Sequence, residues 1–385
     1  MTGQDVKVLK ADDAGDRSMW LAAWRECGRE PFAHPAYVEL FAGSPGEQAR
    51  CLVARSDAGT AILPLVLRPI HHSVRGLRPR LQDAISPYGY GGPYGATDGS
   101  TVRVWSLLAD WMRGEGVVSM FARLALDANR PTDLPVDAVV RTAAENIVVD
   151  LTRPEAEQWF HYEHKVRKNV NKALRAGLAV SIRPRFTDLT EFVALYHATM
   201  SRRDASTFYR FDHRFFDTIQ TELPENCLAA EVRDPAGRLV SAELVLTSDR
   251  FLYSYLGGTL DDAFPTRPND LLKHEVINHG RAIRRHGFVL GGGLAAGDGI
   301  FRYKRSFDPT GSVPFRTLRL IADQHAYALL TRAHLGPRPS DDEDEGFFPA
   351  YRAPVDGGDQ ARQAPPSDLV VQDGRQEHGE RRPHG

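Results

Sequence analysis

Residues 227–258 read CLAAEVRDPAGRLVSAELVLTSDRFLYSYLGG, and this stretch decides the fold. Its apolar and β-branched runs are separated by a DPAG turn and an SDR turn, which predicts consecutive strands. A loop over 257–268 leads into a segment with apolar residues at helical spacing, which ends before Gly287. The run FVLGGG at 288–293 is typical of a short buried strand that leads into glycines. We therefore predict strands, a loop, a helix and a strand, in that order.

The first half of the chain shows the same order of signals. Residues 51–70, CLVARSDAGTAILPLVLRPI, predict two strands around a turn. A loop rich in tyrosine and glycine follows, then a helix near 100–113 and a strand over 117–126. This repetition predicts a mixed α/β fold of two tandem domains, each a mixed β-sheet flanked by helices.

The length of 385 residues fits two domains and a tail. We place the first domain at residues 1–150, the second at 151–334 and the tail at 335–385. The tail begins with an acidic SDDEDE run and contains few apolar residues. Such a composition cannot offset chain entropy by burial, so we expect the tail to be disordered and dispensable for stability and activity.

Composition excludes several classes of protein. The formal net charge of -2 gives no overall attraction to nucleic acid. The three cysteines and fourteen histidines show no metal-ligand spacing, so no metal is assigned. No window is apolar enough to span a membrane, and the polar N-terminus resembles no leader. We expect a cytoplasmic protein.

A basic segment lies between the two halves. Thr152 and Glu155 have the spacing of a capping box, and Gly177 supplies a stop, which predicts one long helix. Its polar face carries Lys165, Lys168 and Lys172. These lysines could contact the phosphates of an RNA, although charged helix faces are usually only solvated and no stacking aromatics interleave with them. A second helix is predicted over 188–203.

Four motifs carry a resemblance to a known family. They are SPYGYGGPYG at 86–95, HKVRKNVNKALRAG at 164–177, YHATMSRRDASTFYRFD at 196–212 and GGGLAAGDGIFRYKRSF at 291–307. In this order and spacing they resemble the Fem-type peptidyltransferases of the GNAT acyltransferase superfamily. The resemblance implies two GNAT-like domains side by side and transfer of an acyl group to an amine.

The same resemblance suggests the substrates. Fem enzymes use aminoacyl-tRNA as donor and an amine of a peptidoglycan precursor as acceptor, and other relatives modify small natural products. The residues over 212–225 leave no room for the coiled-coil arm of several Fem proteins. The loops GGPYGATDGS and GGTLDDAFPTRPND lack the usual spacing for binding CoA pyrophosphate, which disfavours acetyl-CoA or another acyl-CoA as the donor.

Two residues are candidates for catalysis. Lys304 matches the lysine that the Fem pattern places after a glycine-rich strand end, and its charge could stabilise an oxyanion or hold phosphate. The alternative is a solvated lysine in a basic run. Asp298 could orient Lys304 or the amine, but it is also a good turn residue. Gly291, Gly292 and Gly293 would permit close ligand approach, or simply form a turn.

The candidates for substrate binding are mainly aromatic. Tyr88 and Tyr90 either line an acceptor groove or cover a core. Tyr255 shares a strand face with Tyr253, which is either the substrate cleft or the domain interface, and the resemblance favours Tyr255 for the cleft. Arg203 and Tyr209 fall where Fem-type proteins hold the phosphates or carboxylates of the acceptor. Arginines at a helix C-terminus also suit the helix dipole in any protein.

No arrangement of nucleophile and base is evident, and an aminoacyl ester does not need one. The leading hypothesis is therefore amide formation by transfer from aminoacyl-tRNA to an amine of a peptidoglycan precursor or natural product. An acyl-CoA-dependent N-acyltransferase is the second hypothesis. A catalytically silent module that binds a precursor is the third.

Overall fold

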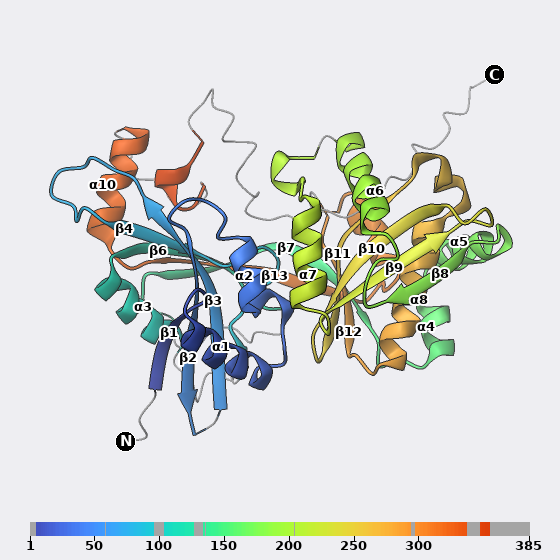
Figure 1. The fold of residues 1–385 in the computed structure, drawn as a ribbon, viewed down its shortest axis with the longest axis horizontal. Helices are drawn as coiled ribbons and strands as arrows, with labels where there is room; N and C mark the ends of the chain where they lie inside the picture. The colour runs from blue at the N-terminus through green and yellow to red at the C-terminus, as the bar shows by residue number, and fades with distance from the viewer. Residues whose placement is uncertain are drawn as a thin grey trace.

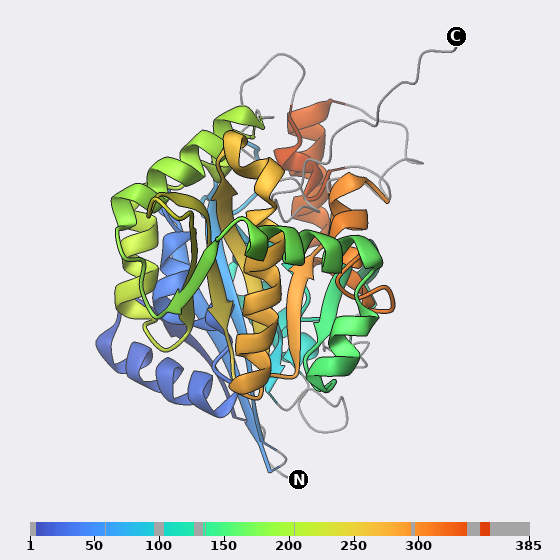
Figure 2. The ribbon, with the colours of Figure 1, turned by 90° about the vertical axis from the view of Figure 1, so that its right-hand side faces the viewer.

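The strands form one continuous sheet with helices packed on both faces (Figure 1, Figure 2). The computed structural model describes residues 5–57, 59–95, 104–126, 134, 136–203, 205–293, 297–336 and 347–354. Across this part of the chain the strand order is β1-β2-β3-β4-β6-β13-β7-β12-β11-β10-β9-β8, and β5 pairs with β3.

The element bounds follow the chain order. The strands are β1 (Asp5–Lys10), β2 (Gln48–Ser56), β3 (Gly59–Ile70), β4 (Leu81–Ile85), β5 (Tyr94–Gly95), β6 (Val117–Arg123), β7 (Ala138–Asp150), β8 (Ala179–Arg183), β9 (Cys227–Arg233), β10 (Leu239–Thr247), β11 (Phe251–Thr259), β12 (Gly287–Gly291) and β13 (Ser312–Ile321). The α-helices are α1 (Ala14–Glu26), α2 (Pro35–Leu40), α3 (Val104–Glu115), α4 (Glu155–His161), α5 (His164–Arg175), α6 (Leu189–Arg202), α7 (His213–Glu222), α8 (Pro268–Ala282), α9 (Gly299–Arg305) and α10 (Gln324–Leu335). Short 3-10 turns are η1 (Pro31–Ala33), η2 (Thr207–Tyr209), η3 (Asp261–Thr266) and η4 (Ala350–Arg352).

Burial on both faces explains the nearly continuous apolar runs in the strands. Along β10, Ala242, Leu244 and Leu246 pack in the core cluster that includes α6 and α7. Val245 instead joins the cluster that includes α5 and α8. The two clusters lie on opposite faces because successive side chains of a strand alternate.

Each half contains one parallel strand pair, β4 with β6 and β11 with β12. Helices α3 and α8 make the respective crossover connections. The predicted mixed α/β fold with a duplicated unit is thus confirmed. No helical arm was expected over 212–225, and this segment forms only the 10-residue helix α7.

The last strand and helix return to the first half of the sheet. β13 lies between β6 and β7 and is antiparallel to both. Its Leu318 and Leu320 pack in the same core cluster as α3, and α10 lies over β6. The predicted boundary at residue 150 falls at the end of β7, and the sheet continues across it.

The predicted long helix over 152–177 is wrong, because two helices occupy this segment. α4 and α5 are separated at Tyr162, whose ψ of 145° is extended. The capping box does not form: the N-cap of α4 is Pro154, which makes no side-chain cap. Thr152 instead bonds to Asp150 through its backbone amide, at 2.9 Å, and its hydroxyl, at 2.6 Å.

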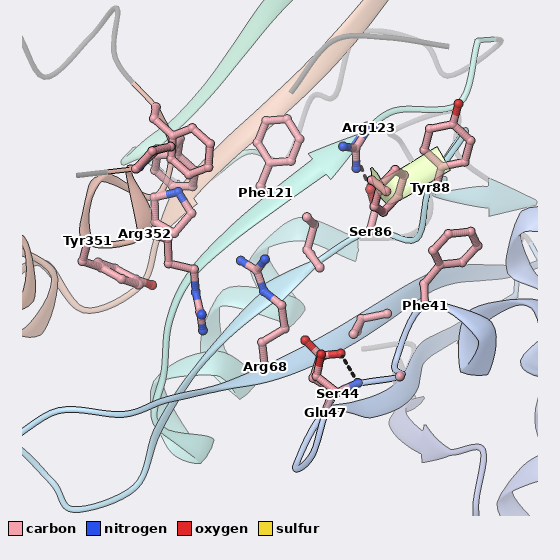
Figure 3. A pocket seen from close by; sticks show the side chains of 18 of the residues that line it. Phe41, Ser44, Glu47, Arg68, Ser86, Tyr88, Phe121, Arg123, Tyr351 and Arg352 are labelled. Atoms are coloured by element: carbon pink, nitrogen blue, oxygen red, sulfur yellow. Dashed lines mark hydrogen bonds between the residues drawn. The ribbon is translucent and has the colours of Figure 1, made fainter. Parts of the chain in front are cut away.

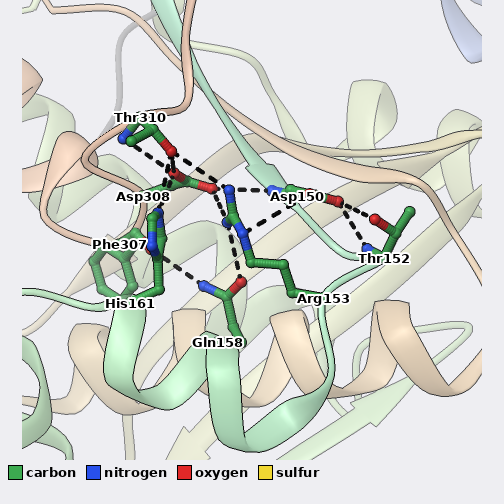
Figure 4. Close-up of polar contacts among 8 residues, drawn as sticks. All are labelled: Asp150, Thr152, Arg153, Gln158, His161, Phe307, Asp308 and Thr310. Carbon is green, nitrogen blue, oxygen red and sulfur yellow. Dashed lines mark hydrogen bonds and ion pairs between the residues drawn. The ribbon is translucent and has the colours of Figure 1, made fainter.

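A buried carboxylate holds this break in place (Figure 4). Asp308, whose side chain is fully buried, accepts bonds from Arg153 Nη1 at 2.5 Å and pairs with His161 Nε2 at 2.8 Å. The amide of Glu163 donates to the Ser306 carbonyl at 2.9 Å. Contacts to residues far along the chain therefore replace the local signals that predicted one helix.

Part of the expected disordered tail packs against the first half. Tyr351 is only 7% exposed and shares a core cluster with Tyr327 of α10. Arg352 Nε pairs with Asp83 at 2.5 Å. The expectation of an unstructured tail is wrong for residues 347–354, because a few aromatic residues suffice to bury this short segment. Residues 337–346 and 355–385 lie outside the described residues.

Candidate functional site

The parallel strands of the second half part from one another at their carboxyl ends. β11 and β12 are in register from Phe251 and Gly287 up to Tyr253 and Val289, and the pairing stops there. In open α/β sheets, ligands bind at the carboxyl ends of parallel strands where neighbouring strands diverge. We therefore take this opening as the centre of the candidate site.

Glycines let the end of β12 approach its neighbours. Gly291 has a φ of 78°, in the left-handed region that favours glycine. A Cβ on Gly292 would lie 2.6 Å from the carbonyl oxygen of Glu145 in β7. Gly292 is buried and Gly293 half-buried. The glycines therefore allow a close backbone approach at the strand opening.

Lys304 comes from α9, and it is buried rather than solvated, with 1% exposure. Its Nζ donates to the Gly292 carbonyl at 2.6 Å. Burial lowers the pKa of Lys304 well below its usual value, Lys273 lowers it further, and Glu243 and Asp298 oppose the shift. Asp298 is the N-cap of α9 and accepts from the amide of Phe301 at 2.7 Å.

A buried ion pair lies near Lys304. Lys273 Nζ of α8 is 2.6 Å from Glu243 Oε1 of β10. Ser254 of β11 donates to the same oxygen and accepts from Lys273. All three residues are at most 5% exposed. The cluster thus combines two lysines with one carboxylate inside the second half.

Two polar atoms of this region are unsatisfied. Among the described residues, Glu243 Oε2 and Asn146 Nδ2 are buried and have no hydrogen-bond partner. The amide oxygen Oδ1 of the same Asn146 side chain would be 3.5 Å from a Cβ on Gly292, which places this side chain beside the residue whose carbonyl binds Lys304. Buried polar groups are normally hydrogen-bonded, so such exceptions indicate where a ligand or water would bind.

The predicted tyrosines come together in an aromatic layer where the halves meet. The Tyr88 ring lies 5.9 Å from Tyr209 and 6.1 Å from Tyr255. The Tyr255 hydroxyl is 2.8 Å from that of Tyr37 in α2. Tyr90 packs on Tyr253, with 5.5 Å between ring centroids. These tyrosines are at most 5% exposed and belong to one core cluster.

The aromatic layer borders the ion-pair cluster. A void of about 10 Å³ is lined by Tyr88, Tyr90, Tyr255 and Ser254, among others. Ser254 is the residue that bonds to Glu243 and Lys273. Space for about one water thus lies between the tyrosines and the buried charges.

A larger cavity of about 600 Å³ lies at the carboxyl ends of the other parallel pair (Figure 3). Ile85 is the last residue of β4 and Ser86 follows it, and Phe121 and Arg123 lie at the carboxyl end of β6. Tyr88 also lines this cavity, so the aromatic layer separates it from the small void. The other charged residues of the described lining are Glu47, Arg68 and Arg352, and His334 also lines the cavity.

The other predicted site residues lie apart or at the margin. Arg203 is the C-cap of α6 and acts electrostatically on Lys304. Lys168 and Lys172 are exposed on α5, and Lys165 pairs with Glu163 at 3.4 Å. None of these three lysines lines the cavity or the void. The α5 face is therefore a surface separate from the candidate centre.

Sequence reasoning missed several members of the site. Glu243 is a lone carboxylate in the apolar strand LVSAELVLT, and Lys273 adjoins Leu272 on the buried side of α8. A charged residue at a core position is itself a signal, because unpaired buried charges are costly. Arg68 and Arg352 lie 284 positions apart along the chain, and nothing in either local sequence connects them.

The described part of the chain has neither a metal-binding group of side chains nor a helix that could span a membrane. No group of histidine, cysteine and carboxylate side chains there has the geometry to hold a metal ion. No helix within the same residues has the length and apolarity to cross a membrane.

Comparisons with known proteins define the class. Residues 162–305 match the family model described as an acetyltransferase (GNAT) domain. The solved structure of FemX is 13% identical, with a TM-score of 0.59, over 81% of this chain and 98% of that chain. L-PGS from Bacillus licheniformis is 14% identical, with a TM-score of 0.53, over 86% of this chain and 99% of that chain. No curated protein sequence matches.

The C-terminal domain of a protein assigned as a lysylphosphatidylglycerol synthetase, from Agrobacterium fabrum, is also similar. It is 16% identical, with a TM-score of 0.51, over 83% of this chain and 95% of that chain. Residues 162–305 are thus similar to a GNAT acetyltransferase domain. The chain as a whole shares the fold of FemX and of the other two structures, which is the fold that the four motifs led us to expect.

Proposed function

We propose that this protein transfers an aminoacyl group from aminoacyl-tRNA to the amine of a peptidoglycan precursor or small natural product, forming an amide. The main support is the buried cluster of Lys304, Lys273 and Glu243 at the opening between β11 and β12. It lies in the half that matches the acyltransferase family model. Perturbed ionisable groups with unsatisfied polar neighbours are typical of active sites.

The chemistry needs a neutral amine and a group that stabilises the oxyanion. Attack of the amine forms a C–N bond, and collapse of the intermediate breaks the ester C–O bond and releases the tRNA hydroxyl. Because burial lowers the pKa of Lys304, its neutral amine can accept the proton that the attacking nitrogen loses. The resulting lysinium would then stabilise the oxyanion and return the proton to the leaving oxygen.

The acceptor would enter through the 600 Å³ cavity of the first half. Tyr88 borders both that cavity and the small void beside Ser254. Movement of Tyr88 and Tyr255 would join the two spaces and bring the acceptor amine to Lys304. This is a gating step, as in other enzymes whose sites open by local rearrangement.

One observation favours a second candidate, an acyl-CoA-dependent N-acyltransferase. The family model that matches residues 162–305 describes an acetyltransferase domain. The opening between β11 and β12 would then bind the thioester of acyl-CoA in place of an aminoacyl ester. The donor therefore needs a direct test.

The test is incubation of the purified protein with radiolabelled aminoacyl-tRNA or labelled acetyl-CoA, each with the same pool of amines. We expect label to move from aminoacyl-tRNA into an alkali-stable amide, and the Lys304→Met variant to transfer little. Transfer from acetyl-CoA alone would establish the second candidate. Failure of both donors with every amine class would contradict the proposed reaction.

A further inference from the structure

The C-terminal segment 347–354 forms one wall of the cavity in the first half. Six of its residues line the space: Phe347, Phe348, Pro349, Tyr351, Arg352 and Pro354. They face Phe41 and Tyr88 from the other side of the cavity (Figure 3). The cavity is thus lined by residues that lie far apart along the chain.

Specific contacts hold this wall. The Tyr351 hydroxyl is 2.7 Å from Ser119 Oγ in β6, and Phe348 stacks on Tyr327 with 5.8 Å between ring centroids. Arg352 Nη2 donates to the Pro69 carbonyl at 2.9 Å. A segment anchored by buried aromatics and hydrogen bonds is a fixed part of the site.

Two arginines share one carboxylate at this wall. Asp83 is fully buried, and its two oxygens accept from Arg68 Nε at 2.7 Å and Arg352 Nε at 2.5 Å. The three groups together retain one positive charge. Within the described residues, neither Nη group of Arg68 has a hydrogen-bond partner, and the Arg68 side chain points into the cavity (Figure 3).

The rest of the lining leaves this net positive charge unchanged, because its arginine and its carboxylate offset each other. Arg123 is a further cation, whereas Glu47 is the one carboxylate among the described lining residues. The other walls are largely aromatic, from Phe41, Phe121 and Phe208. A guanidinium with free Nη groups suits a carboxylate or phosphate, and the rings suit an apolar body.

We propose that segment 347–354 determines the ligand specificity of this cavity: Arg352 and Arg68 bind the carboxylate or phosphate of a ligand whose apolar body packs between the aromatic walls. Under the proposed function, on which this assignment of the ligand's role rests, that ligand is the amine acceptor. The acceptor would therefore be an anionic amphipathic molecule, and the tail would select it.

Calorimetry with small probes tests the binding site without any donor. We expect 1-naphthyl phosphate and 1-naphthoate to bind the full chain, and neutral 1-naphthol to bind more weakly. Arg352→Gln should weaken binding of the preferred anion by about tenfold, since one charge-assisted contact is lost, and should leave 1-naphthol unchanged. Arg352→Lys should retain part of the anion affinity. Whichever anion binds more tightly identifies phosphate or carboxylate as the preferred group.

The control variant is Arg113→Gln, an exposed arginine of α3 that does not line the cavity. Its probe affinities should equal those of the unmodified chain. Equal affinity for the anions and 1-naphthol, or no effect of Arg352→Gln, would overturn the proposal. Probe binding without any acyl transfer would instead refute the proposed function alone.

Arg352→Gln could weaken binding by releasing segment 347–354, and a rise in hydrogen exchange at residues 350–352 would reveal this. Tyr351→Phe is the second variant, which separates loss of an anchoring contact from loss of the guanidinium. That change removes the bond to Ser119 and retains the arginine. Full anion affinity in Tyr351→Phe together with loss in Arg352→Gln assigns the effect to the guanidinium. Loss of affinity for 1-naphthol as well as the anions in Arg352→Gln would show a purely structural segment and overturn the specificity role.

Discussion

At the scale of single residues, burial changes what the charged side chains of this protein can do. Lys304 looks like one cation of a solvated FRYKRSF run, but it is 1% exposed and bonded to Gly292. His34 is likewise buried, and its Nδ1 accepts from the amide of Ala36 at 3.3 Å. Substitution of Lys304 should change turnover, and protonation of His34 should change the stability of the fold.

Lys304→Met should reduce turnover with little effect on folding. The substitution keeps most of the aliphatic length and removes the amine that binds Gly292. Loss of one group that stabilises the oxyanion lowers kcat by about 100-fold to 1000-fold. Steady-state kinetics and thermal unfolding measure the two effects, with the exposed Arg305→Gln as control. A variant with unchanged kcat and KM would remove Lys304 from the active site.

His34 should make the protein less stable in acid. Burial, and then Arg17 and Arg25, lower its pKa from 6.5 to about 3. Between these values the unfolded state binds a proton that the folded state does not, so this stability is complete above pH 6.5 and is lost as pH falls. The slope is about 1.4 kcal/mol per pH unit.

His34→Asn is the matched variant, because asparagine can still cap α2. Urea unfolding at pH 7 and at pH 5 should show a smaller loss of stability in the variant. His274, whose pKa burial lowers to about 4, contributes equally to both proteins and cancels in the comparison. Parallel losses in the two proteins would contradict the buried neutral state of His34.

At the scale of elements, contacts distant in sequence decide where α4 ends and α5 begins. Asp308 holds Arg153 and His161 from the far side of the break. Burial alone would raise the pKa of Asp308, but the bonds from Arg153 and His161 lower it. The bounds of strands such as β10, and of α8, do not depend on such distant contacts. Their apolar residues follow the pattern of burial in the fold, so the local sequence predicts them.

Asp308→Asn should destabilise the protein strongly. The amide cannot pair with Arg153, and removal of one partner from a buried ion pair costs about 3 to 5 kcal/mol. Chemical denaturation gives the change in unfolding free energy. Asp110→Asn, at an exposed pair with Arg113, is the control and should change stability by less than about 1 kcal/mol. Equal effects of the two substitutions would show that the Asp308 contacts do not stabilise this junction.

The basic face of α5 should matter only if the donor is tRNA. Replacing Lys165, Lys168 and Lys172 with Gln should raise the KM for tRNA and flatten its salt dependence. Each lost phosphate contact removes about 0.7 to 0.9 from the log-log slope. The control replaces three exposed arginines of another surface: Arg75, Arg78 and Arg80. An unchanged slope would leave α5 as a solvated face.

At the scale of the whole molecule, residues from the second half of the sequence complete the part of the sheet that the first half forms. β13 lies between β6 and β7, and α10 and the segment 347–354 cover the first half. The first half of the sequence therefore lacks a central strand of its own sheet.

A fragment of residues 1–150 should not fold alone. Without β13, the inner edges of β6 and β7 stay unpaired, and the space filled by Leu318 and Leu320 is empty. Circular dichroism and thermal unfolding should show no cooperative transition. A fusion of 1–150 to 311–335 through a Gly-Ser linker should regain one. A cooperative transition in 1–150 alone would establish an independent first domain.

The sequence by itself determined the α/β class, the duplicated order of elements and the Fem-like motifs, because these depend on local periodicity, turn residues and spacing. It also indicated Lys304, Gly291 and Gly292, which the fold brings together at the opening of β11 and β12. Only the tertiary structure decided that Glu243 and Lys273 join Lys304, that Arg352 meets Arg68 at Asp83, and that the helix over 152–177 breaks. These features depend on contacts between distant residues, and a local pattern carries no information about a partner that lies far along the chain.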